Sequence, residues 1–517
     1  MTFEIVFVLL SLLGMMAALI ADKMRPGMVL FSVVVLFLCA GILTPKEMLE
    51  GFSNKGMITV ALLFLVSEGI RQSGTLGQVI KKLLPQGKTT VFKAQLRILP
   101  SVAFISAFLN NTPVVVIFAP IIKHWAKSVK LPATKFLIPL SYVTILGGIC
   151  TLIGTSTNLV VHGMILEAGY EGFTMFELGK VGIFIAIAGI LYIFLFSKRL
   201  LPDARPDTAV PDEEVEEGEK LHRVEAVLGA RFPGINKKLS DFNFQRHYGA
   251  EVKEIKTRSG QRFVDHLEDV VLREGDTLVV MADDTFIPTW GESSVFVLLT
   301  NGNEPDTSGK KKRWLALLLL VLMIVGATVG ELPATKEMFP DIKLDMFFFV
   351  CITTIIMAWT NIFPARKYTK YISWDILITI ACAFAISKAM VNSGVADCVA
   401  KFIIGLSDDY GPHVLLAMVF IITNLFTELI TNNAAAALAF PLALSISAQL
   451  GVSPTPFFVV ICMAASASFS TPIGYQTNLI VQGIGNYKFT DFVRIGLPLN
   501  IITFLISVIL IPLIWNF

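Results

Sequence analysis

Long apolar runs recur along almost the whole chain and set the strongest limit on its fold. Each run is close to the roughly 20 residues that a helix needs to cross the hydrocarbon core of a bilayer. In lipid, a helix also satisfies its own backbone hydrogen bonds. The runs lie at about 3–20, 27–43, 57–70, 98–122, 136–165, 178–197, 313–332, 345–363, 374–390, 412–446, 457–484 and 495–515. The sequence therefore predicts an all-α polytopic protein of the cell (inner) membrane, with the lipid bilayer as a partner.

The composition fits a chain covered by lipid and excludes several other classes of protein. Only 16% of the residues are charged, against about 25% in a typical soluble domain. The 42 Lys and Arg residues nearly balance 40 Asp and Glu residues, so nothing favours nucleic acid as a partner. The sequence contains no Walker loop and no GxSxG or HExxH motif. We therefore expect neither an ATP-driven pump nor an enzyme.

A polar stretch divides the apolar runs into two sets. Residues 201–221 are acidic and lack an apolar pattern, which predicts a solvated linker. Residues 222–290 contain alternating segments and turn signals, which predict a small α/β cytoplasmic domain. We expect residues 291–312 to form a second linker. The whole stretch 201–312 is then expected to be cytoplasmic. The membrane part then consists of a first repeat at 1–200 and a second repeat at 313–517.

The two membrane halves share two motifs in the same order. Leu109-Asn110-Asn111-Thr112 in the first half corresponds to Ile430-Thr431-Asn432-Asn433 in the second. The segment Gly154–Asn158 corresponds to Gly474–Asn478, and its shift along the chain is almost the same as that of the first motif. Two motifs with nearly equal spacing indicate an internal duplication, which is common in secondary transporters.

The run at 98–122 is interrupted by Asn110-Asn111-Thr112-Pro113 in its middle. Each part has about 12 residues and is too short to cross a bilayer, so we expect a re-entrant hairpin. Each half then has five transmembrane helices and one hairpin, and the odd number of crossings makes the second half inverted. An alternative with twelve plain helices would place the basic loops 71–97 and 123–135 on opposite sides of the membrane.

Lys and Arg in the loops support the inverted arrangement. The five loops predicted to be cytoplasmic contain seventeen Lys and Arg residues, whereas the five predicted outer loops contain five. Cytoplasmic loops of membrane proteins carry this excess of positive charge. The cytoplasmic loops are 21–26, 71–97, 123–135, 364–373 and 485–494, and the outer loops are 44–56, 166–177, 333–344, 391–411 and 447–456.

The polar interruptions are candidates for binding ions. Polar backbone is tolerated at membrane depth only when it is buried in protein or lines a cavity. Helix N-termini at such breaks favour an anion, and carbonyl groups favour a cation such as sodium. Ser106 and Thr427 lie four residues before Asn110 and Thr431, so each hydroxyl is expected to face its hairpin tip. Glu428, the acid closest to a tip, has either a structural role or a role in proton or ion coupling.

These motifs resemble those of the divalent-anion:sodium symporter family. The resemblance rests on the two Asn/Thr tips, each followed by a Gly-x-x-x-Asn break, and on Thr427-Glu428 before the second tip. It covers both membrane halves. Residues 222–290 resemble a TrkA C-terminal (RCK-type) domain, with Glu274-Gly275-Asp276 as the typical turn. The family resemblance implies an elevator-type symporter that works as a homodimer.

The resemblance also implies two sodium sites and a substrate site. The residues carried over to sodium are Ser106, Asn110, Asn111, Gly154, Thr427, Ile430 (through its carbonyl), Asn432 and Gly474. Those carried over to the substrate are Asn111, Thr112, Thr155, Ser156, Thr431, Asn432, Asn433, Tyr475 and Gln476. Sodium is thus the expected coupling ion.

The breaks depart from the family pattern, because Ser156-Thr157 and Gln476-Thr477 stand where dicarboxylate carriers usually have Pro-Pro. The additional hydrogen-bond donors favour a small tetrahedral oxyanion, so we expect import of a divalent anion, sulfate before others. A sodium-coupled dicarboxylate transporter and an ion or proton antiporter that uses Glu428 are the alternatives. For the cytoplasmic domain we expect regulation by a small ligand or by dimerisation, with a folded spacer as the alternative.

Overall fold

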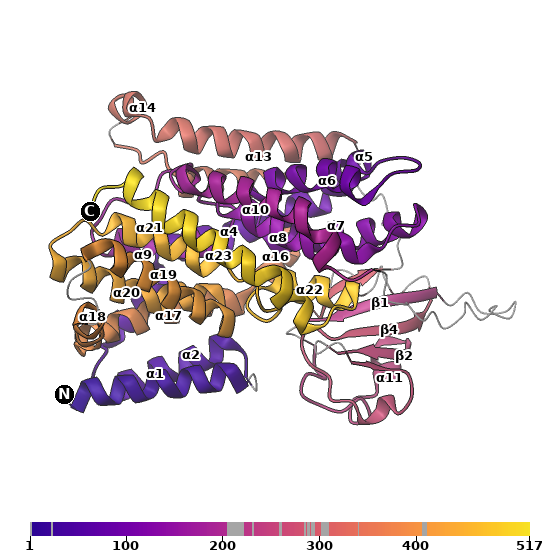
Figure 1. The fold of residues 1–517 in the computed structure, drawn as a ribbon, viewed down its shortest axis with the longest axis horizontal. Coiled ribbons are helices and arrows are strands. Elements are labelled where there is room, and N and C mark those ends of the chain that lie inside the picture. Colours follow the sequence, from indigo (N-terminus) through magenta and orange to yellow (C-terminus); the bar gives the residue numbers. More distant parts are fainter. Residues whose placement is uncertain are drawn as a thin grey trace, which may run out of the picture.

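The computed structural model describes residues 3–21, 24–203, 222–229, 232–257, 261–283, 286, 290, 295–300, 310–339, 341–405 and 411–517. Within these residues, eight helical segments are long and apolar enough to cross a membrane, and four shorter apolar helices accompany them. The prediction of a multi-pass helical membrane protein is therefore confirmed. The helices run roughly along the long axis of the molecule, and a small sheet lies at one end, beyond α7 and α22 (Figure 1). Both termini lie at the opposite end.

The helices fall into two sets, one on each side of the sheet in the sequence. The first set is α1 (Phe3–Ala21), α2 (Pro26–Cys39), α3 (Pro45–Glu50), α4 (Lys55–Gln72), α5 (Thr75–Leu83), α6 (Val91–Ser106), α7 (Asn111–Ser128), α8 (Leu137–Gly148), α9 (Ser156–Glu167) and α10 (Gly179–Leu200). The second set is α13 (Lys310–Gly330), α14 (Pro333–Met338), α15 (Met346–Trp359), α16 (Tyr368–Tyr371), α17 (Trp374–Asn392), α18 (Val395–Gly405), α19 (Gly411–Leu429), α20 (Asn432–Leu450), α21 (Thr455–Ser466), α22 (Gln476–Gly485) and α23 (Phe489–Ile514).

The helices are interrupted at both predicted tips. The first tip separates α6 from α7, and the second separates α19 from α20. Asn110 and Thr431 are the N-cap residues of α7 and α20. Asn111 and Asn432 therefore begin the following helices instead of standing in the turn. A first helical turn has free N–H groups, so polar residues there lose no helical hydrogen bond.

The predicted breaks are shifted toward the N-terminus. Residues 149–155 separate α8 from α9, and residues 467–475 separate α21 from α22. Ser156 and Gln476, which we expected inside the breaks, are the first residues of α9 and α22. Polar side chains are common in the first turn of a helix. The polar segment of the sequence therefore continues from the irregular backbone into the start of the next helix.

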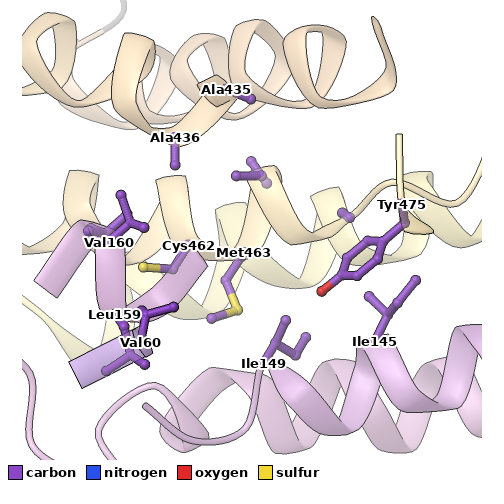
Figure 2. Packing of buried hydrophobic residues seen from close by; sticks show 14 of the residues in the cluster. Val60, Ile145, Ile149, Leu159, Val160, Ala435, Ala436, Cys462, Met463 and Tyr475 are labelled. Carbon is purple, nitrogen blue, oxygen red and sulfur yellow. The ribbon is translucent and has the colours of Figure 1, made fainter. Parts of the chain in front are cut away.

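Small side chains allow close packing around these interruptions. Ala434, Ala435, Ala436 and Ala437 in α20 are all buried. Small residues let membrane helices approach closely, where van der Waals contact drives association. Figure 2 shows this region, with Leu159 and Val160 of α9 near Cys462 and Met463 of α21 and with Ala436 of α20 above them. α9, α20 and α21 thus pack together across the two halves.

The small domain is built on a five-stranded sheet. Its strands are β1 (His222–Leu228), β2 (Glu251–Lys256), β3 (Arg262–Phe263), β4 (Thr277–Ala282) and β5 (Phe296–Thr300), in the order β3-β2-β4-β1-β5. All neighbouring strands are antiparallel, and the short helix α11 (Phe244–Tyr248) accompanies them. β5 lies in the range 291–312, which we predicted as a linker. It belongs to the domain instead, because it pairs with β1 in the sheet. Most of the acidic linker, residues 204–221, is outside the described residues.

An ion pair joins the sheet domain to the first membrane half. The Lys123 ammonium in α7 donates to both carboxylate oxygens of Glu225 in β1 at 3.0 Å, and Lys256 lies 3.5 Å from the same carboxylate. Burial of Glu225 raises its pKa, but the attraction of Lys123 and Lys256 is stronger and lowers the pKa to about 2. A buried, ionised carboxylate of this kind depends on its cationic partners.

This pKa predicts how docking of the domain responds to pH. Because the folded pKa is depressed below the ordinary value of 4.5, the stabilisation is complete above about pH 4.5 and is lost as the pH falls toward 2. The docked state is expected to persist unchanged from pH 8 to pH 5. Lys123→Met is expected to weaken docking by about 1–3 kcal/mol, because Glu225 loses its closest cation. Hydrogen exchange of β1 and α7, corrected for intrinsic rates, measures both effects.

Lys253→Met is the matched control. Lys253 pairs with Glu251 at 2.7 Å, but both side chains are about half exposed, and exposed pairs contribute little. Exchange in β1 should therefore equal that of the wild type. Faster exchange of β1 at pH 5 in the wild type, or unchanged exchange in Lys123→Met, would show that this ion pair does not hold the domain.

Candidate functional site

Four helices begin at the tips and breaks, two from each membrane half. Their N-cap residues are Asn110 for α7, Thr155 for α9, Thr431 for α20 and Tyr475 for α22, and none of these four side chains caps its helix. Elsewhere in the chain, Thr44 and Thr90 do cap the helices that they precede. Uncapped N-termini keep free N–H groups and partial positive charge, which favour an anion.

The Tyr475 hydroxyl lies at the centre of this region. The Asn111 amide donates to it at 2.6 Å, and the Thr155 hydroxyl lies 3.1 Å away. Asn432 also interacts with the same hydroxyl. Thr155 and Tyr475 each follow the glycine of their own break and are equivalent in the alignment of the two sequence motifs, so two equivalent residues meet each other. The site thus contains side chains from both tips and both breaks.

A second pair of contacts repeats with the two halves exchanged. The Thr112 hydroxyl lies 3.4 Å from the Gln476 amide oxygen, and the Ser156 hydroxyl donates to the Asn433 amide oxygen at 3.2 Å. In the alignment of the two motifs, Thr112 is equivalent to Asn433, and Gln476 is equivalent to Ser156. A contact between the tip of one half and the break of the other therefore occurs twice.

Each half also repeats the same hydrogen bonds within itself. The Ser106 hydroxyl donates to the Asn111 amide oxygen at 2.7 Å, and the equivalent Thr427 hydroxyl donates to Asn432 at 2.8 Å. The predicted hydroxyl groups thus lie at their tips, although their partner is the fifth residue along and not the fourth. These bonds orient both Asn amides, so that their NH₂ groups can turn toward Tyr475.

Asn158 and Asn478 fix the breaks in the same way. The Asn158 amide donates to the Thr151 carbonyl at 2.9 Å, and the Asn478 amide donates to the Thr471 carbonyl at 3.1 Å. In both halves the irregular backbone is therefore held by a side chain from the first turn of the next helix. This gives hydrogen-bond partners to carbonyl groups that the irregular backbone leaves unpaired.

Both glycines of the breaks lie against backbone oxygens. A Cβ atom on Gly154 would come within 2.6 Å of the Gly148 carbonyl oxygen and 3.0 Å of the Ala107 carbonyl oxygen. A Cβ atom on Gly474 would overlap the Thr427 carbonyl oxygen and the Ser468 hydroxyl. Carbonyl and hydroxyl oxygens therefore lie beside each glycine, and such oxygen ligands suit a hard cation. Among the described residues, no group of three or more His, Cys, Asp and Glu could hold a metal ion.

All the predicted site residues lie at these tips and breaks. Ten of them are buried: Ser106, Asn111, Gly154, Thr155, Thr427, Ile430, Asn432, Asn433, Gly474 and Tyr475. Four are half-buried, namely Asn110, Thr112, Ser156 and Thr431, and Gln476 is exposed. The structure therefore brings the set together, with Gln476 on the accessible side.

Two residues that support the site, Ser141 and Asn500, were not among those predicted from the sequence. The Ser141 hydroxyl of α8 bonds Thr477 at 2.8 Å and Asn478 at 2.7 Å, and so connects the first half to the second break. Asn500 of α23 donates to Glu428 at 2.7 Å. Asn500 is an isolated amide in an apolar run, and that isolation is the signal that could have identified it, whereas Ser141 stands among other hydroxyl residues and carries no such signal.

Glu428 lies beneath the second tip and has two hydrogen-bond donors on one oxygen. The Ser470 backbone N–H donates to Oε1 at 2.9 Å, and Asn500 donates to the same oxygen. Within the described residues, Oε2 is buried and has no partner. One oxygen of this carboxyl group therefore holds the Ser470 backbone and Asn500 in place. The other oxygen lacks a hydrogen-bond partner among the described residues.

The chain matches one protein-family model and is similar to several known transporters. The model of the citrate transporter family CitMHS matches residues 16–443 and 338–517. An uncharacterized transporter of Synechocystis sp. is 29% identical over 94% of this chain and 93% of its own length. An uncharacterized transporter of Escherichia coli is 26% identical over 99% of this chain and all of its own length. Sodium/sulfate cotransporter 2 of Chlamydomonas reinhardtii is 31% identical over 54% of this chain and 31% of its own length.

The family match extends over both membrane halves, including every tip and break described above. It also agrees with the multi-pass helical architecture. The sequence motifs resemble the divalent-anion:sodium symporter family, and the family model that matches the chain is that of the citrate transporters. This chain belongs to the CitMHS citrate transporter family.

Proposed function

We propose that this chain is a sodium-coupled symporter that imports a small divalent anion, sulfate before others. The observation that supports this most is the meeting of four uncapped helix N-termini around Tyr475. In the described hydrogen bonds of the site, Thr, Ser, Asn, Gln and Tyr side chains take part, and no Lys or Arg does. An anion there would be neutralised by sodium, which makes anion and cation binding interdependent.

The two cations would lie beside the two glycines. In the first half, Ser106, Asn110, Asn111 and Gly154 would supply oxygen atoms, and in the second half Thr427, Ile430, Asn432 and Gly474 would do so. The substrate would bind between them, against Thr112, Thr155, Ser156, Thr431, Asn433, Tyr475 and Gln476. Sodium supplies positive charge at the site when bound, and the Asn amides hold their orientation through the hydroxyl bonds.

Two contacts between the tip of one half and the break of the other support an inverted repeat as the basis of alternating access. A two-fold relation between the halves produces contacts such as Thr112–Gln476 and Ser156–Asn433, in which each half supplies the tip once and the break once. We propose that each half has five crossings and one re-entrant hairpin, and that transport follows an elevator mechanism in a homodimer. Under this scheme the two hairpins would open toward opposite sides of the membrane.

We favour sulfate over a dicarboxylate as the substrate because of the polar residues at the two breaks. Ser156, Thr157 and Gln476 offer polar groups close to the tips, and a small tetrahedral oxyanion can accept from several of them at once. A citrate or dicarboxylate substrate is the second candidate, favoured by the family to which the chain belongs. The named relative that transports sodium with sulfate supports the first candidate.

Uptake into proteoliposomes tests the proposal. An inward sodium gradient is expected to drive accumulation of radiolabelled sulfate, and replacement of sodium by potassium is expected to abolish it. Excess unlabelled thiosulfate should compete more strongly than succinate or citrate. Accumulation that ignores the sodium gradient would contradict symport, and stronger competition by citrate would favour the second candidate.

An ion or proton antiporter that uses Glu428 is a different class of function, favoured by the unpaired Oε2 atom. Under our proposal, Glu428→Gln should retain sodium-driven uptake within about threefold of the wild type, since the amide oxygen can still accept from Ser470 and Asn500. Loss of proton movement in this variant, measured with a pH-sensitive dye in the absence of sulfate, would instead indicate the antiporter. Glu4→Gln, at the start of α1, is the control.

We also propose that the five-stranded domain is a cytoplasmic regulatory module of the TrkA C-terminal type. Its position against α7 and α22, two helices that begin at the transport site, supports a regulatory role over that of a spacer. Changes in docking of the domain could then alter the position of both helices.

A further inference from the structure

A cavity of about 630 Å³ lies between the sheet domain and the second membrane half. The domain contributes Phe263, His266 and Arg273 to its lining, and the membrane half contributes Ile473, Gln482 and Phe489. Pockets of about 300–1,000 Å³ are typical of sites for organic ligands. A single inorganic oxyanion would fill only a small part of this volume, so the transported substrate is not its natural occupant.

Gln482 is the residue that indicates a missing partner. Its side chain lines the cavity and is only 2% exposed. Within the described part of the chain, neither its amide oxygen nor its amide nitrogen has a hydrogen-bond partner. A buried polar group without a partner costs about 1–3 kcal/mol, and here both a donor and an acceptor are unmet. A ligand with an acceptor and a donor on neighbouring atoms would satisfy both.

The other lining residues indicate the rest of the ligand. Phe263, Phe489 and Ile473 offer apolar surface, against which a flat ring can pack. Arg273 and His266 can hold an anionic group, and a planar guanidinium is well suited to phosphate. The two carboxylates of the lining already have partners: Asp269 pairs with Lys238 at 3.0 Å, and Asp276 accepts from the Arg273 backbone N–H at 2.7 Å.

We propose that this cavity binds a nucleotide. The edge of the base, which carries neighbouring donor and acceptor atoms, would pair with the Gln482 amide. The ring would pack against Phe263 and Phe489, and the phosphate would lie at Arg273 and His266. The ligand thus bridges the sheet domain and the membrane half, with Gln482 on one side and Arg273 on the other.

The position of Gln482 connects this cavity to the transport site. Gln482 lies in α22, whose first residue, Gln476, meets Thr112 of the first tip. α22 also packs against α7, which carries the ion pair to the domain. A nucleotide that holds Gln482 to the domain would restrict the movement of α22. This regulatory step rests on the proposed function, whereas binding of the nucleotide does not.

Titration of the purified full-length chain with AMP, GMP, CMP and UMP, followed by calorimetry, tests the proposal. At least one nucleotide is expected to bind, and Gln482→Leu is expected to weaken it by about tenfold or more, as the loss of two hydrogen bonds requires. Arg273→Gln is expected to weaken binding of the nucleotide but not binding of the corresponding nucleoside, which has no phosphate. Gln449→Leu is the control, since that amide bonds Ser445 at 3.0 Å away from the cavity.

The Gln482→Leu variant is expected to fold normally, because the amide has no hydrogen-bond partner to lose among the residues that the structure describes. Its melting temperature without ligand should equal or exceed that of the wild type. Failure of all four nucleotides to bind, equal binding by Gln482→Leu, or inorganic phosphate binding as tightly as the nucleotide would each overturn the proposal. Nucleotide binding by a protein that transports no sulfate would leave this site intact and contradict only the proposed function.

Discussion

Asn111→Ala and Asn432→Ala are each expected to reduce sodium-driven sulfate uptake to background, on the order of 100-fold or more. Each amide is held by a hydroxyl, from Ser106 at 2.7 Å or from Thr427 at 2.8 Å. Asn111→Ala takes from the Ser106 hydroxyl its bond to the amide oxygen, and a buried group left unpaired costs about 1–3 kcal/mol. Each substitution also removes one of the partners of the Tyr475 hydroxyl, which keeps Thr155 at 3.1 Å. Each also removes a proposed ligand of both the cation and the anion, so the two losses multiply. Initial rates of uptake of labelled sulfate into proteoliposomes measure the effect.

Sodium dependence distinguishes a binding role from a structural one. If Asn111 binds sodium, raising the sodium concentration should restore part of the uptake in Asn111→Ser, which keeps one oxygen. Asn392→Ala is the matched control: Asn392, the last residue of α17, bonds the Ile42 carbonyl at 3.1 Å and Glu47 at 3.0 Å, and none of these residues belongs to a tip or a break. Uptake by Asn111→Ala or Asn432→Ala above half the wild-type rate, at equal protein amount, would contradict the proposed site.

The architecture of the membrane part could largely be predicted from the sequence, because lipid imposes strict rules. An apolar run of sufficient length has few structures open to it other than a helix. Polar residues such as Asn110 and Thr431 in the middle of a run mark interruptions for the same reason. The shift of the breaks toward 149–155 and 467–475 could not be predicted, since Ser156 and Gln476 are polar whether they lie in a loop or in the first turn of a helix.

The sequence indicates which residues lie at the tips and breaks, but not the contacts that these residues make. The repeat identified which residues are equivalent, yet nothing in the spacing indicates that Thr155 and Tyr475 meet each other. Such contacts depend on how the two halves pack. The same limit applies to the cavity at Gln482, because one wall comes from the sheet domain. β5 was missed for a related reason: a short strand that follows an irregular segment becomes part of a domain only through pairing with β1.

Gly154 and Gly474, the glycines of the two breaks, allow a close approach of backbone segments at the site. Their role follows from the backbone atoms beside them and not from a left-handed conformation. Gly474 lies against the carbonyl of Thr427, the residue whose hydroxyl orients Asn432. Any side chain at position 474 must therefore separate the second break from the helix that leads into the second tip. The oxygen atoms proposed to bind one cation would be separated by the same movement.

Gly474→Ala is accordingly expected to lower sodium-driven uptake by at least about tenfold and to raise the sodium concentration needed for half-maximal uptake. Gly154→Ala should act in the same direction, since its Cβ would lie 2.6 Å from the Gly148 carbonyl oxygen. Gly14→Ala in α1 is the control, because a Cβ atom there has no neighbour within 4 Å and alanine favours a helix by up to about 1 kcal/mol. Rates measured across a range of sodium concentrations compare the three variants. Wild-type sodium dependence in Gly474→Ala would mean that the close approach of the break to Thr427 serves packing alone, and the cation would then have to bind elsewhere.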